Sequence, residues 1–292
     1  MAQIVDLLKA GRTYSFEFFP PKSDAELAIL SKTLHDLQPL RPSFVSVTYR
    51  GGAESRRRTY NLVTGMLHTT ELVPMAHLVC VAHSRLELAE ILVAHRRGGV
   101  QNLMALGGDP PNDPLAEPGE LRHAIELVEL ARAIGGFSIG VAAHPAGHPN
   151  SPDMARDRQF LAAKLELADF AVTQFFFDVA EYETLREQLS RLGVDKPVVP
   201  GMMPVTSLAS IPRMAVMGAP VPPALVARLQ DADALGGAEG VRRAGIEACT
   251  DLCRRLLDAG APGLHFYTLN RSSATREIYE TLGLAPSLTE SR

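Results

Sequence analysis

The chain has 292 residues, 46% of them hydrophobic, which is enough to bury one large core without a second domain. Its 29 basic and 33 acidic residues are spread along the sequence and give a formal net charge of -4, so we expect no nucleic-acid partner. Three cysteines are too few for a disulfide framework and indicate a reducing compartment, so we expect a cytoplasmic protein.

The N-terminal segment MAQIVDLLKAGRTYSF is too short and too interrupted in its apolar run for a signal peptide or a membrane span, so we expect no membrane partner. Eight apolar runs of strand length follow, at 13–19, 44–49, 73–80, 100–106, 137–143, 170–177, 197–203 and 263–269. Between them, apolar residues recur at three- and four-residue spacing and predict helices, for example at 26–37, 85–97 and 120–134. This alternation predicts an α/β fold, a TIM-type (β/α)8 barrel forming one domain over 1–292. An open doubly wound sheet is the alternative.

Two segments interrupt the even repeat. The Pro- and Gly-rich stretch 107–120 predicts a loop after the fourth strand. The longer stretch 207–261 predicts extra helices between strands seven and eight, broken near Pro220 and at the glycine pair 236–237. Within it, Cys249 and Cys253 are four residues apart, as expected for two side chains buried on one helix face. The basic run 56–58 predicts the solvated opening of a helix rather than a phosphate site.

Polar residues at the ends of barrel strands are the candidates for chemistry, because active sites of such barrels lie at the carboxyl ends of the strands. Glu17 stands between Phe16 and Phe18, where desolvation is expected to raise the pKa of the carboxyl group toward that of a general acid. Asp109 follows two glycines after the fourth strand, and Gln174 lies in the sixth run. Their structural alternatives are a buried ion pair, a turn with an Asx cap, and a satisfied core amide, respectively.

Several histidines raise the question of a metal. None of them has HxH or HExxH spacing, and two lie in the proline-containing loop HPAGHP, so we expect no metal site. These histidines are His77, His83, His144, His148 and His265.

Seven segments together resemble the methylenetetrahydrofolate reductase family. They cover almost the whole chain in order, and SFEFFPP followed by TQFFFD and FYTLNR at these separations is highly specific. The segments are SFEFFPPK (15–22), FVSVTYRGG (44–52), ALGGDPP (105–111), VAAHPAGHP (141–149), TQFFFD (173–178), VPGMMPV (199–205) and HFYTLNR (265–271).

The resemblance implies reduction of 5,10-methylenetetrahydrofolate to 5-methyltetrahydrofolate with a reduced nicotinamide cofactor. It implies that Glu17 is the acid that assists protonation at N10, and that Asp109 contacts the pterin and favours the 5-iminium cation. It further implies substrate binding by Gln174, Tyr267 and Arg271. The positions that the resemblance assigns to the cofactor are Thr48, His77, Gly108, His144, His148, Asp157 and Lys164.

Members of the family hold FAD, but this chain departs from the family pattern at the flavin anchors. Gly107 replaces an arginine, His144 replaces a tyrosine, and Phe160 and Ala163 stand where the family has polar or basic residues. Charge-assisted contacts to phosphate contribute roughly 1.5–3 kcal/mol each, so losing two or three of them costs on the order of 3–9 kcal/mol. We therefore expect a flavin-independent enzyme in which hydride passes directly from NADH or NADPH.

Three alternatives stay open at this stage. FAD could bind through compensating residues such as Arg156 or Arg158, which would leave a flavoenzyme that performs the same reaction. A folate-binding barrel without redox activity would not need Glu17, and a metal-dependent hydrolase would need more ligands on the first strand. Without a Rossmann fingerprint, the sequence does not choose between NADH and NADPH, and the oligomeric state is left open as well.

Overall fold

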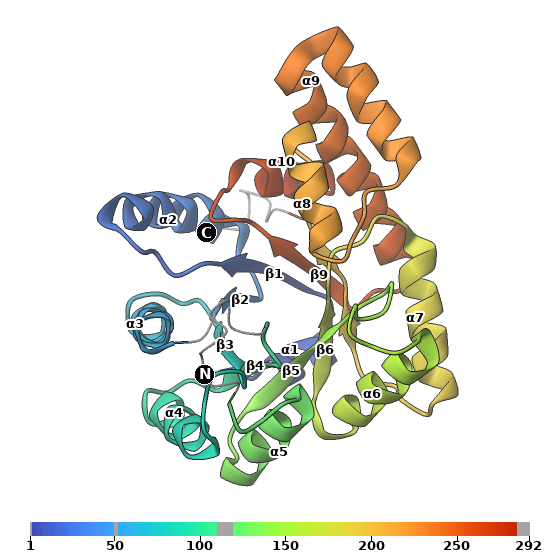
Figure 1. The fold of residues 1–292 in the computed structure, drawn as a ribbon. Helices are drawn as coiled ribbons and strands as arrows, with labels where there is room; N and C mark the ends of the chain where they lie inside the picture. The colour runs from blue at the N-terminus through green and yellow to red at the C-terminus, as the bar shows by residue number, and fades with distance from the viewer. Residues whose placement is uncertain (1, 50–51, 110–118, 285–292) are drawn as a thin grey trace.

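Parallel strands form one sheet that curves into a nearly closed barrel in the computed structural model, which describes residues 2–49, 52–109 and 119–284 (Figure 1). The strand order is β7-β6-β5-β4-β3-β2-β1-β9-β8. The strands are β1 (Thr13–Phe18), β2 (Phe44–Val47), β3 (Pro74–Val79), β4 (Asn102–Leu106), β5 (Ser138–Ala143), β6 (Phe170–Thr173), β7 (Val198–Val199), β8 (Gly201–Met202) and β9 (Gly263–Tyr267). The predicted TIM-type barrel is confirmed.

The seventh predicted strand, 197–203, is divided in the structure. β7 pairs with β6, and β8 pairs with β9, so this short stretch joins the two ends of the sheet. The division falls at Pro200, which has no N–H to donate, while its carbonyl accepts a hydrogen bond from the backbone N–H of His265 at 2.9 Å. The sixth strand is also shorter than predicted: it ends at Thr173, which places Gln174 in the loop that follows.

Helices surround the strands, as Figure 1 shows. They are α1 (Ile4–Ala10), α2 (Asp24–Leu37), α3 (Ala53–Thr69), α4 (Arg85–Arg97), α5 (Ala124–Ile134), α6 (Met154–Leu167), α7 (Val179–Arg191), α8 (Ile211–Val216), α9 (Pro223–Asp258) and α10 (Ser273–Thr281), with short 3-10 turns η1 (Gln38–Leu40) and η2 (Leu208–Ser210). No described helix is long and apolar enough to cross a membrane.

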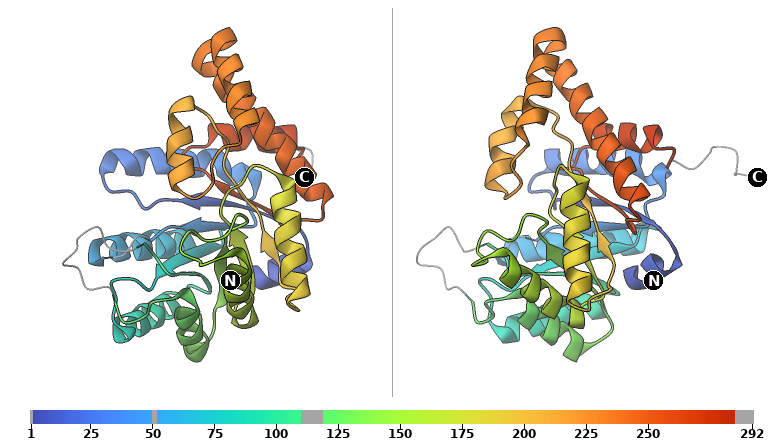
Figure 2. Two further views of the ribbon diagram at one scale, coloured as in Figure 1. Left: turned by 45° about the vertical axis from the view of Figure 1, so that its right-hand side comes forward. Right: turned by 90° about the vertical axis from the view of Figure 1, so that its right-hand side faces the viewer.

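The predicted extra helices between strands seven and eight are α8 and α9. α9 is broken at Gly237, whose φ of 57° and ψ of -150° are not helical, and its two halves project from the barrel as a hairpin (Figure 2). A Cβ at Gly240 would lie 2.2 Å from the carbonyl oxygen of Ala232, so only glycine lets the two halves approach this closely. Cys249 and Cys253 are both buried on the second half, as predicted.

Side chains alternate between two cores because successive residues of a strand point to opposite faces. Phe16 and Phe18 belong to the outer core between strands and helices. Phe44, Met75 and Phe170 belong to a second cluster inside the barrel. Ser15 and Glu17 alternate with the two phenylalanines of β1, which turns their side chains to the barrel interior.

Helix α1 closes the amino-terminal end of the barrel. Its first N–H groups have no cap of their own, and the backbone N–H of Ile4 donates to Asn102 Oδ1 at 2.8 Å, while that of Val5 donates to Ser138 Oγ at 3.1 Å. Ile4 and Leu8 are buried in the same interior cluster as Phe44 and Met75. The opposite end, where the strands terminate, is the open mouth.

Candidate active site

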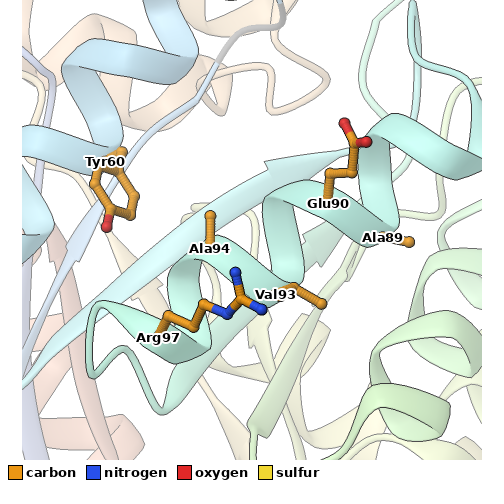
Figure 3. A pocket seen from close by; sticks show the side chains of 6 residues that line it. All are labelled: Tyr60, Ala89, Glu90, Val93, Ala94 and Arg97. Atoms are coloured by element: carbon orange, nitrogen blue, oxygen red, sulfur yellow. The ribbon is translucent and has the colours of Figure 1, made fainter.

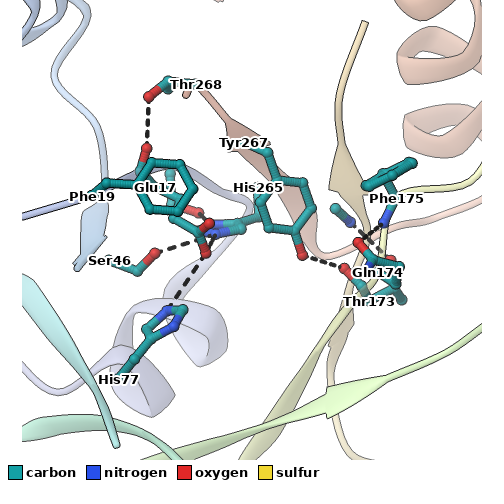
Figure 4. A network of polar contacts seen from close by, with 12 residues as sticks. Glu17, Phe19, Ser46, His77, Thr173, Gln174, Phe175, His265, Tyr267 and Thr268 are labelled. Carbon is teal, nitrogen blue, oxygen red and sulfur yellow. Dashed lines mark hydrogen bonds and ion pairs between the residues drawn. The ribbon is translucent and has the colours of Figure 1, made fainter. Parts of the chain in front are cut away.

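Glu17 lies at the centre of a buried polar network in the barrel mouth (Figure 4). Only 9% of the residue is exposed, and its Oε2 atom is 3.6 Å from His77 Nε2 and 3.8 Å from His265 Nε2. Both separations are longer than a hydrogen bond, so neither imidazole is directly hydrogen-bonded to the carboxylate. His265 is fixed from β1 and β2, because its Nδ1 lies 2.7 Å from Ser15 Oγ and its Nε2 lies 3.4 Å from Ser46 Oγ.

The imidazole of His77 is neutral at physiological pH. Burial lowers the pKa of His77 to about 4, against the opposing effect of the nearby Glu17 carboxylate. Its Nε2 atom is buried and has no hydrogen-bond partner among the described residues, and the same is true of Thr48 Oγ1. Buried polar atoms are nearly always paired in folded proteins, and the described residues hold four more unpaired ones, at Thr13, His95, Gln101 and Tyr279. His77 Nε2 is the candidate for a ligand contact because it also lies 3.6 Å from Glu17.

We expect this neutral histidine to make the protein less stable in mild acid. The folded-state pKa near 4 lies below the usual 6.5, so the unfolded chain takes up the proton first, and stability is lost as the pH falls from 6.5 to 4. When the pH is lowered from 7.5 to 5, the free energy of unfolding should fall in both proteins. The fall should be about 2 kcal/mol smaller in His77→Gln than in the wild type. Urea unfolding at both pH values measures this, with the exposed His35→Gln as control; equal losses in wild type and His77→Gln would contradict the assignment.

Tyr267 stands beside Glu17 on the neighbouring strand. The two residues are register partners of β1 and β9, and the Tyr267 hydroxyl donates to the carbonyl oxygen of Thr173 at 2.6 Å. Burial, together with the charge of Glu17, holds the pKa of Tyr267 well above its ordinary value. Thr268 donates through Oγ1 to the Glu17 carbonyl oxygen at 2.6 Å, which fixes the end of β1. Tyr267 therefore lines the same mouth as Glu17.

Gly108 and Asp109 follow β4 on a tightly packed turn. The backbone N–H of Val81 donates to the carbonyl oxygen of Gly107 at 3.0 Å, which extends the pairing of β3 and β4. Gly108 has a φ of 86°, and a Cβ there would lie 2.4 Å from Val81 Cγ1, so both conformation and space require glycine. Asp109 is exposed, and in the described part of the chain its carboxylate has no partner. The remainder of the predicted loop, 110–118, lies outside the described residues.

The loop after β5 is held by a buried ion pair. Asp157 accepts hydrogen bonds from the backbone N–H of His148 and from Ser151 Oγ, both at 2.9 Å, and its Oδ2 lies 2.5 Å from Arg158 Nη1. Arg158 also donates to the carbonyl oxygens of His144 and Pro145. The charged groups of Asp157 and Arg158 therefore both bind the loop and fix its conformation.

Lys164 and His144 border this loop. Lys164 Nζ donates to the carbonyl oxygen of Ala142 at 3.1 Å, and burial lowers the pKa of its amine. Burial, with His148 and Lys164 adding to it, lowers the pKa of His144 to about 4. Phe160 is 54% exposed on α6, where it presents an apolar ring to solvent. These residues fit a flavin diphosphate poorly, because Arg158 and Lys164 are bound to the protein itself, and of the cations of α6 only Arg156 stays exposed in the described structure.

Gln174 and Arg271 lie at other parts of the rim. Gln174 Oε1 accepts from the backbone N–H of Phe175 at 3.0 Å, and its Nε2 donates to the carbonyl oxygen of Met217 at 3.3 Å. Arg271 is exposed, with no side-chain partner among the described residues. Its loop is anchored by Asn270, which exchanges two hydrogen bonds with the backbone of Phe19 at 2.8 and 2.9 Å.

The structure thus brings Glu17, His77 and Tyr267 together. It places Thr48, Gly108–Asp109, the β5 loop, Gln174 and Arg271 after other strands. Ser15, Ser46 and His265 were not identified as site residues from the sequence. The two-residue period of a strand puts Ser15 on the face opposite Phe16 and Ser46 on the same face as Phe44, which places both serines inside the barrel. A separate hollow of about 470 Å³ lies on the outside between α3 and α4, lined by Tyr60, Ala89, Glu90, Val93, Ala94 and Arg97 (Figure 3). It contains none of the predicted site residues.

The fold and the mouth define a class: a (β/α)8-barrel enzyme with a buried carboxylate and a neutral histidine at the carboxyl ends of its strands. Residues 1–283 match the family model described as methylenetetrahydrofolate reductase. The chain belongs to that family and is an oxidoreductase.

Relatives of known name agree with this assignment, and one solved structure shares the fold. The chain is 34% identical over 276 residues to the 5,10-methylenetetrahydrofolate reductases of Pectobacterium carotovorum and Escherichia coli, covering 94% of this chain and 91% and 92% of theirs. A Clostridium thermocellum protein, described as binding two copies of 5-methyl-5,6,7,8-tetrahydrofolic acid, superposes with a TM-score of 0.67 over 96% of each chain at 12% identity. At that identity, the likeness shows the fold alone.

Proposed function

We propose that the protein reduces 5,10-methylenetetrahydrofolate to 5-methyltetrahydrofolate with NADH or NADPH. The observation that carries this proposal is the buried carboxylate of Glu17, which lies in the mouth beside the unpaired Nε2 atom of His77. The named activity of the relatives supports it. One domain over residues 1–292 would carry the whole reaction.

Glu17 acts as the general acid. Protonation at N10 breaks the C–N10 bond of the five-membered ring and leaves a 5-iminium cation, whose carbon then accepts hydride from the dihydronicotinamide C4 to become the methyl group. The nicotinamide is oxidised, and the proton remains on N10.

The other predicted residues orient the substrate and favour the cation. Asp109 contributes negative charge near the developing iminium, as the family resemblance implies. Gln174 offers the pterin both a donor and an acceptor, once it releases the contacts that it now makes to Phe175 and Met217. Tyr267 lines the mouth, and Arg271 takes the far end of the folate.

Hydride passes directly, without a flavin. In support, the family's flavin contacts are replaced at Gly107, His144, Phe160 and Ala163, while Arg158 and Lys164 are bound within the protein. The positions that the family resemblance assigns to the cofactor would then border the dihydronicotinamide, in the space that a flavin ring would occupy, although His144 is itself one of the replaced residues. These positions are Thr48, His77, Gly108, His144, His148, Asp157 and Lys164.

Kinetics and cofactor analysis test direct transfer. Both substrates must be bound together, so initial rates should follow a sequential pattern, and purified protein should be colourless at 450 nm. Added FAD should raise neither the activity nor the melting temperature, because a ligand that does not bind the folded state does not stabilise it. Ping-pong kinetics or stoichiometric bound flavin would contradict direct transfer. The protein would then catalyse the same reaction as an ordinary flavoenzyme.

A further inference from the structure

A second hollow, of about 240 Å³, adjoins the mouth beside Gln174. Three loops and the first turn of α7 enclose it: the loops contribute 144–146, 174–177 and 218–220, and the helix contributes Glu181. Most of its lining is apolar, with Phe175 and Phe177 meeting edge to face at 6.1 Å. Glu181 is the charged residue of the lining, and no lysine or arginine of the described residues lines the hollow with it.

The carboxylate of Glu181 is available to a ligand. Glu26, Glu87 and Glu126 occupy the equivalent third position of α2, α4 and α5, and each accepts a backbone N–H at 2.7–2.9 Å beside the start of its helix. Glu181 Oε1 accepts a longer hydrogen bond, of 3.5 Å, from the backbone N–H of Phe177, and within the described residues no cation pairs with it. This helix start is capped instead by Asp178, which accepts from the backbone N–H of Ala180.

The chemistry of this lining fits a nucleoside. Aromatic and proline side chains give flat apolar surfaces for a planar base. An ionised carboxylate is an acceptor only, so it suits the two adjacent hydroxyl donors of a ribose. It would repel a phosphate group on that ribose, and likewise the glutamate tail of a folate. NADH carries the free ribose diol on its adenosine half, whereas NADPH carries a 2′-phosphate there.

We propose that this hollow binds the adenosine half of the reductant, with Glu181 accepting hydrogen bonds from the ribose hydroxyls, so that the protein uses NADH in preference to NADPH. The inference rests on the proposed function, because direct transfer requires the nucleotide and the folate to be bound at once. With the folate in the mouth, the nucleotide needs a place of its own, and the hollow opens next to Gln174, the residue proposed to hold the pterin.

The test compares both nucleotides on charge variants of Glu181. The ratio of kcat/KM for NADPH to that for NADH should rise about threefold in Glu181→Gln and about tenfold or more in Glu181→Lys. Glu183→Gln and Glu183→Lys are matched controls, because Glu183 is exposed on the same helix outside the hollow. They should leave the ratio within about twofold of the wild type. Melting temperatures show whether each variant is folded.

Dissociation constants of NADH and NADPH, measured by nucleotide fluorescence without folate, give a second readout that does not depend on turnover. The same change in ratio there would support the site. An unchanged ratio in both measurements would overturn it, and so would a change confined to the KM for folate. If the wild type binds nucleotide under the control of Glu181 but does not reduce folate, the proposed function fails while this inference stands.

Discussion

Glu17→Gln is expected to lower kcat by about 100-fold or more, as removal of a general acid does. The amide keeps the shape of the side chain but has no acidic proton to give to N10. The loss should appear in kcat and leave folate binding nearly intact, because the change acts on bond breaking. The fold should survive, since within the described residues the nearest partners of the carboxylate are two imidazole nitrogens at 3.6 and 3.8 Å.

Steady-state kinetics at saturating folate measure this effect, and circular dichroism confirms the fold. Glu129→Gln is the matched control, because Glu129 is exposed on α5 and far along the chain from any site residue. A Glu17→Gln protein that kept more than half of the wild-type rate would show that the acid is another group.

Asp109→Asn is expected to lower kcat by about 10- to 100-fold, and to reduce folate affinity much less. Asparagine preserves the size of the side chain and most of its hydrogen bonding, but removes the negative charge that favours the iminium cation. That charge matters more once the cation has formed than when the neutral substrate binds. Stability should not change, because Asp109 is exposed and unpaired within the described residues.

The measurement is kcat and KM for folate at saturating nucleotide, with the exposed Asp195→Asn as control. A change restricted to KM, with kcat unaltered, would show that Asp109 binds the ground state and does not stabilise charge.

The barrel and its order of strands could be predicted from the sequence because they follow from local periodicity. Apolar runs and helical repeats alternate along the chain, and buried parallel strands covered by helices read as continuous apolar segments. The residues at which the strands end could be predicted less well from the sequence. The apolar run continues through 174–177, but pairing stops at Thr173, where the backbone turns into the next loop. Pro200 divides the seventh strand because its missing N–H leaves a gap in the ladder on one side.

The candidate site was only partly accessible from the sequence. Glu17 could be recognised, since a charge inside an apolar strand is costly and stands out. His265 and Ser15 could not, because a histidine or serine in a strand is equally common in a satisfied core. Glu181 was missed for a related reason: an acidic residue in the first turn of a helix usually caps it, as Glu87 and Glu126 do here.

By itself, the sequence determined the fold class, the family resemblance and the residues at which that resemblance weakens, because these depend on residue types and their spacing. Only the tertiary structure decided what each charge is available to do. Arg158 and Lys164 are cations in the sequence, but in the folded chain they are bound to a loop and to β5. Glu181 accepts one long hydrogen bond from Phe177 and pairs with no cation of the described residues. Availability depends on which atoms approach within hydrogen-bonding distance, and side chains distant in sequence meet only when the barrel closes.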